Sequence, residues 1–186
     1  GQRRPPPAVL ARWTPDHTNQ DQLIGLQMAK LPAASLPIKQ LSRPNFWQQQ
    51  AITTQQIVPL FQRLHQILSR LHQLQIVVGD LNETNIFFTS PTKNPAQPFW
   101  IDVDSYQFAH FPCPVAMPAF LDPTLYHVAD FGVRPYFTPL TDWYAFTVLL
   151  VKSLLQVHPY GGVHRQYKSL QARATAGVSF LQAGVT

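Results

Sequence analysis

Two loops of the sequence carry acidic and amide side chains at a spacing that suits chemistry at a metal ion. In the first loop, Asp80 follows Gly79 and lies five positions before Asn85. In the second, Asp102 follows an apolar run and lies seventeen positions after Asn85. A carboxylate can accept the proton of a hydroxyl group, and an amide oxygen can bind Mg²⁺. Asp80 is therefore the candidate general base and Asn85 a candidate metal ligand.

A long helix is predicted to lead into the first loop. Thr53 and Gln56 have the spacing of a capping box, which is typical of a helix start. Behind them, apolar residues recur at steps of three and four, which predicts one apolar stripe on a helix of about twenty residues. The stripe consists of Ile57, Leu60, Phe61, Leu64, Ile67, Leu68, Leu71 and Leu74. We interpret this stripe as core.

Short apolar runs beside the two loops predict strands. Residues 76–78 precede Gly79-Asp80, residues 86–88 follow Asn85, and residues 99–101 lead into Asp102. Turn-forming residues separate the last two runs, which predicts a β-hairpin. Because each acidic residue follows an apolar run, we expect the carboxylates of Asp80 and Asp102 to lie side by side.

The second half of the chain predicts an irregular segment followed by a buried helix. Residues 109–141 are rich in proline and aromatic residues without sustained periodicity. Thr141 is expected to cap a helix that begins near Asp142. The apolar stretch 143–155 is shorter than the roughly 20 residues of a membrane span, so we interpret it as a core helix. Residues 165–181 have weak helical character. The expected fold is mainly α with a small β-hairpin.

The order of these features resembles a protein-kinase catalytic domain. The spacing from Asp80 to Asn85 resembles the kinase catalytic loop H-R-D-x-x-x-x-N, and Asp102-Val103-Asp104 stands where kinases carry D-F-G. The sequences G-D-L-N-x-x-N and I-D-x-D-S are similar to those of a bacterial protein-kinase-like family, over about residues 23–170. The resemblance implies that Asp80 is the base and that Asn85 and Asp102 bind Mg²⁺ on the phosphates of ATP. Asp104 stays outside this set.

Further segments extend the resemblance. Residues 120–123 occupy the place of the A-P-E element, and residues 158–161 complete the series. Asp142 looks like the kinase aspartate that tethers the backbone of the catalytic loop, although an acid at a helix N-terminus also has a local rationale. A literal Asp130-Phe131-Gly132 lies too close to the helix at Asp142 to open an activation segment, so we set it aside.

The chain also departs from the kinase pattern. Val78-Gly79 replaces His-Arg before the candidate base, which predicts no phosphorylation-dependent activation of the usual kind. We expect residues 1–22 to be an extended lead-in and residues 23–186 to be the C-terminal lobe, with residues 23–28 as its hinge strand. No Gly-rich loop or ATP-anchoring lysine strand precedes this hinge. The N-lobe is therefore expected to be largely missing, and the chain alone to be poorly active.

Composition limits the other function classes. The net charge is +5, but the 14 Lys and Arg residues are scattered, which does not favour nucleic-acid binding by this segment. Some members of the kinase-like family are joined to helix-hairpin-helix DNA-binding segments, and none is apparent in this sequence. Cys113 is the single cysteine, so a structural thiol in a reducing cytosol is expected. His65 and His72 are seven positions apart and are expected at the surface, because zinc pairs on helices lie three or four apart.

The sequence thus predicts transfer of the γ-phosphate of ATP, with Mg²⁺, to Ser or Thr of a protein substrate. Two alternatives stay open. One is a pseudokinase scaffold that binds a partner without catalysis. The other is a small-molecule kinase of the aminoglycoside or choline type, which also tolerates a residue other than Arg before its aspartate. The proline-rich segment and the helix at Asp142 favour the protein-kinase branch.

Overall fold

The computed structural model describes residues 15–16, 19–23, 30–89, 96–182 and 184–186. The chain divides into two compact units, residues 1–33 and 34–186. In the first unit, β1 (Pro15–Asp16) pairs with β2 (Asn19–Leu23) in an antiparallel manner. Part of the expected lead-in therefore forms strands. The expected hinge, residues 23–28, lies outside the described residues except for Leu23, which ends β2.

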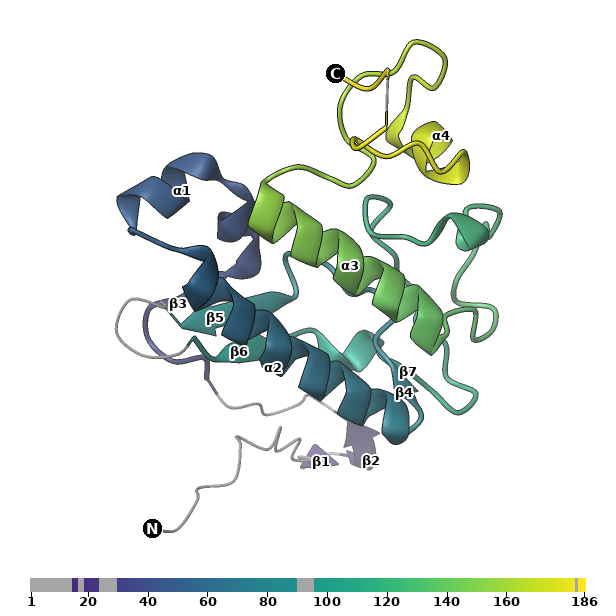
Figure 1. Cartoon of the computed structure of the whole chain (residues 1–186). Helices are drawn as coiled ribbons and strands as arrows, with labels where there is room; N and C mark the ends of the chain where they lie inside the picture. The colour runs from purple at the N-terminus through teal and green to yellow at the C-terminus, as the bar shows by residue number, and fades with distance from the viewer. Residues whose placement is uncertain (1–14, 17–18, 24–29, 90–95, 183) are drawn as a thin grey trace. The chain divides into compact units, whose positions relative to one another are not determined.

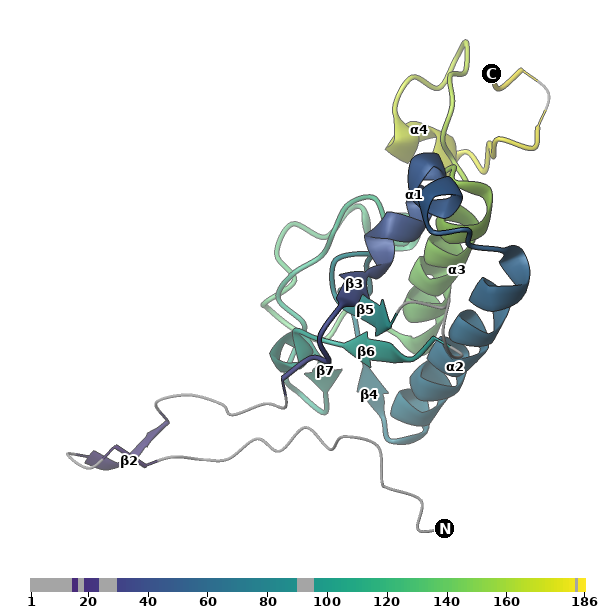
Figure 2. The same ribbon diagram turned by 90° about the vertical axis from the view of Figure 1, so that its left-hand side faces the viewer.

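Two long helices dominate the second unit, and they lie side by side in both views (Figures 1 and 2). They are α2 (Thr54–Gln73) and α3 (Pro139–Leu155). The shorter helices are α1 (Pro44–Gln49), α4 (Leu170–Thr175) and the 3-10 turns η1 (Ile38–Ser42), η2 (Val103–Ser105) and η3 (Pro123–Leu125). The described residues thus form a mixed α/β fold of helices and a few short strands, which is compatible with the predicted mainly α fold. Within the part of the chain that the structure describes, no helix is long and apolar enough to cross a membrane.

The α2 helix forms as its sequence predicts. Its capping box is present, with the Thr53 N–H donating to Gln56 Oε1 at 2.8 Å. The predicted stripe is the buried face of the helix, through Ile57, Leu60, Phe61, Leu64 and Leu68. Leu74, by contrast, follows the end of the helix and is 55% exposed, so the core stripe ends before it.

Three short strands lie on one side of the helix pair (Figure 2). They form an antiparallel sheet in the order β3 (Ser35–Pro37), β5 (Ile86–Thr89) and β6 (Pro98–Trp100). The predicted hairpin is confirmed, since β5 pairs with β6 and Ile86 lies opposite Trp100. The run at residues 76–78 does not join this sheet. It supplies β4 (Ile76–Val77), which pairs with β7 (Gln107–Phe108).

The main core lies between the helices and the three-stranded sheet. Phe61 of α2 meets Phe146 of α3 edge to face, with ring centroids 5.9 Å apart. Phe88 of β5 and Ile38 of η1 are fully buried in the same cluster. Burial of such side chains stabilises a fold by about 1.5–3 kcal/mol each, so this cluster fixes the positions of α2 and β5, the elements that flank the first acidic loop.

The start of α3 differs from the prediction. The N-cap is Thr138 rather than Thr141, because Pro139 suits the first position of a helix and moves the start upstream. Thr141 is the third helical residue, and its N–H donates to the Thr138 hydroxyl at 3.3 Å. The interpretation of residues 143–155 as a buried core helix is only partly right. Thr147 and Leu155 are exposed, so one flank of α3 is open.

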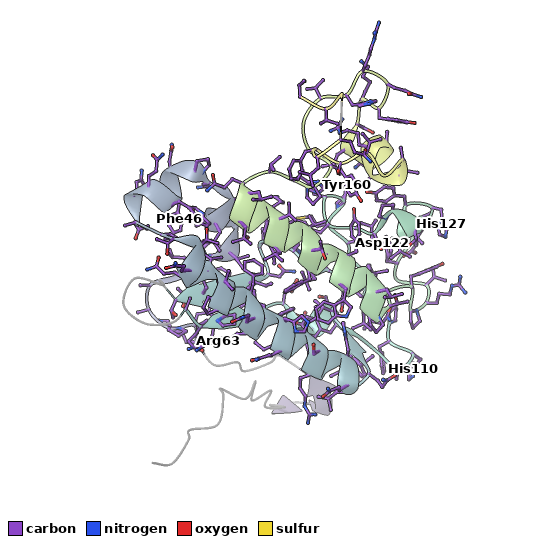
Figure 3. All side chains as sticks on the ribbon, viewed as in Figure 1. Phe46, Arg63, His110, Asp122, His127 and Tyr160 are labelled. Carbon is purple, nitrogen blue, oxygen red and sulfur yellow. The ribbon has the colours of Figure 1, made fainter. Side chains whose placement is uncertain are left out.

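Residues 109–137, here called the strap, connect β7 to the N-cap of α3. The irregular character predicted for residues 109–141 holds as far as Thr138, since η3 is the one helical turn of the strap among the described residues and residues 139–141 belong to α3. Val77 of β4 joins three buried strap residues, Cys113, Leu125 and Phe137, in a second apolar cluster. Figure 3 shows His110 near the beginning of the strap, and Asp122 and His127 on either side of η3. Of the weakly helical stretch 165–181, only α4 is helical.

Candidate active site

The two acidic loops meet at the end of the three-stranded sheet. The chain leaves α2, passes through β4 and reaches Asp80, and Asn85 stands directly before β5. Asp102 follows β6 closely, and the N–H of Ile101 donates to the Asn85 carbonyl at 3.0 Å. Pairing of β5 with β6 therefore carries both loops to the same place.

The three residues singled out from the sequence lie close together. Asn85 Nδ2 is 3.3 Å from Asp80 Oδ2 and 3.5 Å from Asp102 Oδ2. It is also 3.2 Å from the Asp80 carbonyl oxygen. The Asn85 amide thus lies between the two carboxylates. This juxtaposition is what the layout of the sequence leads one to expect.

Asp102 occupies a strained and electronegative position. Its backbone is left-handed, with φ 61° and ψ 40°, which is uncommon for a residue other than glycine and frequent at functional sites. Partial burial raises the pKa of its carboxyl group, and the negative charges of Asp104 and Asp80 raise the pKa further. Asp104, left outside the predicted set, therefore acts on Asp102 electrostatically.

The residues at this point fit a magnesium ion. Mg²⁺ in phosphate-binding sites is typically held by one or two carboxylates together with waters and substrate oxygens, so it needs few protein ligands. Asp102 offers a carboxylate to such an ion. Asn85 turns its Nδ2 group to Asp102 while its Oδ1 accepts the Thr84 hydroxyl at 3.3 Å, so its amide has to rotate to bring the oxygen to a metal. A cation would offset the repulsion from Asp104 and Asp80, which adds to the effect of burial on the Asp102 pKa. Across the described ranges, no cluster of three or more His, Cys, Asp or Glu side chains forms a denser metal site.

Asp142 holds the backbone of the first loop, as predicted. Its Oδ2 accepts the N–H of Val78 at 2.8 Å, and its Oδ1 accepts the N–H of Gly79 at 2.9 Å. The Asp142 side chain is fully buried. Both carboxylate oxygens therefore fix the two peptide groups directly before Asp80.

His72 also belongs to this anchor, and the surface position expected for it is wrong. Its side chain is only 10% exposed, and Nε2 lies 2.9 Å from Asp142 Oδ2. The ring of Trp143 meets it edge-on, with centroids 5.4 Å apart. His72 stands four residues after Leu68 and so continues the buried stripe, a signal that could have identified it. His65 is exposed, as expected.

Asn82 shapes the loop between Asp80 and Asn85 and was also missed. It is 1% exposed, and its Oδ1 accepts the N–H of Thr84 at 2.8 Å and the Thr84 hydroxyl at 2.6 Å. Its Nδ2 donates to the Asp80 carbonyl at 3.0 Å. Such a turn is typical of Asn. The Asn-x-Thr pattern was the available signal.

Lys152 explains why the apolar run of α3 is interrupted. Its Nζ lies 2.8 Å from Glu83 Oε2 in the first loop and 4.9 Å from the ring centroid of Phe120 in the strap. The Ser42 hydroxyl donates to the same Glu83 oxygen at 3.4 Å. One cation therefore links α3 to both the loop and the strap.

The other motifs have local roles. In the literal Asp-Phe-Gly, Asp130 Oδ1 accepts the N–H of Gly132 at 2.8 Å, which makes a surface turn. Asp122, in the place of the A-P-E element, accepts the N–H of Thr124 at 2.8 Å and caps η3. Cys113 is fully buried, and burial raises the pKa of its thiol, as suits a structural residue.

The chain matches no protein-family model and none of the curated proteins. These comparisons identify no family.

Proposed function

We propose that this chain is the large lobe of an ATP- and Mg²⁺-dependent phosphotransferase of the protein-kinase type, acting on Ser or Thr. The observation that carries the proposal is the position of the Asn85 amide, within 3.3 Å of the Asp80 carboxylate and 3.5 Å of the Asp102 carboxylate. A proton acceptor and metal ligands at one point are what phosphoryl transfer between oxygens requires. Asn85 serves as a ligand once its amide rotates, because Nδ2 faces the two carboxylates and Oδ1 accepts the Thr84 hydroxyl at 3.3 Å.

Each residue has a distinct task in this proposal. Asp80 orients the attacking hydroxyl group and accepts its proton. Asn85 and Asp102 bind Mg²⁺, which when bound neutralises charge on the transferring phosphate. Asp142 keeps the peptide groups of Val78 and Gly79 fixed, so that Asp80 projects from a rigid loop. Most of the catalytic effect in such a site comes from positioning and electrostatics.

The anchor also supports the protein-kinase branch over the small-molecule branch. The notable features are an aspartate at the start of a core helix that tethers the loop, and a long strap between the metal-binding turn and that helix. A pseudokinase scaffold would have the same lobe without transfer. Binding of Mg²⁺ and ATP that depends on Asp102 would favour an enzyme with an intact site over a scaffold.

The test is the thermal unfolding midpoint of the 186-residue chain with and without ATP and Mg²⁺. A ligand that binds only the native state stabilises it by about 2.7 kcal/mol at a hundredfold excess over its Kd. We expect a rise that requires both components and is lost in Asp102→Ala. The matched control is Asp130→Ala, which removes the aspartate of the literal Asp-Phe-Gly and should retain the rise.

Three results would count against the proposal. They are no rise in the parent chain, a rise without Mg²⁺, or equal loss in both variants. If the rise is present, transfer from radiolabelled ATP to a Ser- and Thr-containing protein tests the chemical step. Loss of that transfer in Asp80→Asn, with the thermal rise retained, would assign the base.

A further inference from the structure

The strap contacts the candidate base directly. The N–H of Met117 donates to Asp80 Oδ1 at 2.9 Å. The other oxygen, Oδ2, is the one that lies 3.3 Å from Asn85 Nδ2. Each oxygen of the Asp80 carboxylate therefore has its own donor, and one of these donors is a main-chain group of the strap.

A second contact lies one residue earlier, at Gly79. Gly79 has φ +73°, and a Cβ placed on it would lie 2.7 Å from Cys113 Cβ and 2.8 Å from Cys113 Sγ. It would also lie 3.1 Å from the ring of Phe137. Because Cys113 is fully buried, its side chain has no open space into which it could turn away from such a Cβ. A side chain at position 79 would have to push the strap off the loop.

Side chains from other elements hold the strap along its length. The Gln107 side chain donates from Nε2 to the Phe137 carbonyl at 2.7 Å, and its Oε1 accepts the Phe137 N–H at 3.1 Å. His158 Nε2 donates to the Ala119 carbonyl at 2.7 Å. Its Nδ1 accepts the N–H of Tyr160, so the ring is held in one tautomer. These anchors use unmodified groups, and none of them needs a phosphate.

We propose that the strap is a permanent positioning element for Asp80, with the Met117 amide orienting the carboxylate and the Gly79–Cys113 contact keeping that amide in place. The role of Asp80 as the base rests on the proposed function. The positioning by the strap adds to that function a statement about its regulation. The base is therefore set in its orientation in the unmodified chain.

Amide hydrogen exchange of the full 186-residue chain, without ATP or Mg²⁺, tests the contact independently of any activity. We expect the Met117 amide to be protected in the unphosphorylated parent and to lose about tenfold or more of that protection in Gly79→Ala. Gly177→Ala is the matched control, because Gly177 has φ +69° and nothing within 4 Å of an added Cβ. Both variants carry the same backbone strain, but only the first collides with Cys113.

A rescue variant guards against general unfolding. The double variant Gly79→Ala with Cys113→Gly removes the two closest colliding atoms, leaving only the Phe137 ring at 3.1 Å, and should restore protection of Met117. The amides of α2 report that each protein is folded. Three outcomes overturn the proposal. One is free exchange of Met117 in the parent, one is retained protection in Gly79→Ala, and one is equal loss in Gly177→Ala.

A second pair of variants separates positioning from packing. Met117→Pro removes the N–H that Asp80 accepts, whereas Met117→Leu keeps it. We expect kcat for phosphotransfer to fall about tenfold or more in the proline variant, with KM for ATP unchanged and with little effect of leucine. Equal kcat values would overturn the positioning role. If Met117 is protected but ATP and Mg²⁺ do not raise the thermal unfolding midpoint of the parent, the proposed function fails and the strap contact stands.

Discussion

Asp142 and Asp102 both contact the first acidic loop, but they lie in opposite environments. Asp142 contacts its beginning, at Val78 and Gly79, and Asp102 its end, at Asn85. Asp142 is fully buried and accepts hydrogen bonds from two backbone N–H groups, with the His72 ring as a third partner. Asp102 has a left-handed backbone, and partial burial together with two acidic neighbours raises the pKa of its carboxyl group. Asp142 thus has three close hydrogen-bond partners, whereas the Asn85 amide approaches Asp102 only to 3.5 Å.

This difference in environment indicates that Asp142 stabilises the site and that Asp102 is available to bind a ligand. A buried carboxylate is stable only when it is fully hydrogen-bonded, so the Asp142 anchor gives rigidity. An acidic cluster with unrelieved repulsion lowers stability but attracts a cation, which is the usual conflict between stability and activity. Substitutions on the two sides should therefore change stability in opposite directions.

The largest expected effect is at Asp142. Asp142→Ala leaves the N–H groups of Val78 and Gly79 buried without an acceptor, and it leaves His72 without its partner. Loss of one member of a buried, hydrogen-bonded charged network costs about 3–5 kcal/mol. Urea unfolding should show this as a fall in the free energy of unfolding.

Asp142→Asn is the control for size, because the amide keeps one oxygen for the two N–H groups. We expect its loss to be smaller than that of alanine. A loss below about 1 kcal/mol for alanine, the usual range for exposed ion pairs, would show that the anchor does not stabilise the fold and would remove the contrast with Asp102.

A smaller effect is expected at His72. His72→Phe retains a ring against Trp143 but removes the donor to Asp142. Hydrogen bonds to charged groups contribute about 1.5–3 kcal/mol, so we expect a loss in the free energy of unfolding in that range. His72→Gln offers an amide donor and should lose less. If phenylalanine is as stable as the parent, ring packing rather than hydrogen bonding explains the buried position.

Much of the fold followed from local patterns. The α2 stripe and the β5–β6 hairpin were predictable because periodicity and turn residues act over a few positions. The pairing of β4 with β7 was not, since each strand has two residues and the contact depends on how the strap closes. The α3 start was misplaced because two threonines, Thr138 and Thr141, compete as caps, and Pro139 decides between them.

The proximity of Asp80, Asn85 and Asp102 was predictable to a similar degree, because their spacing in the chain is tied to the strands beside them. Their roles stay predictions. His72 was missed because its partner, Asp142, is seventy positions away and no local pattern joins them. The Met117 contact with Asp80 was hidden for a different reason, since it uses a main-chain N–H that any residue but proline can supply.

The smallest expected effect is at Asp102, and its sign is opposite. Because the Asp102 pKa is raised above its ordinary 3.8, the folded protein binds a proton more tightly than the unfolded chain does. Stability therefore falls as the pH rises through 3.8 to the folded pKa, and the penalty persists at neutral pH. Asp102→Asn should remove it and raise the free energy of unfolding in Mg²⁺-free buffer, by less than about 1 kcal/mol because the group is largely exposed. Urea unfolding at pH 7 measures the gain, with Asp130→Asn as the control that should not change. A loss of stability in Asp102→Asn would mean that the acidic turn is held together by this carboxylate, and the contrast with Asp142 would then disappear.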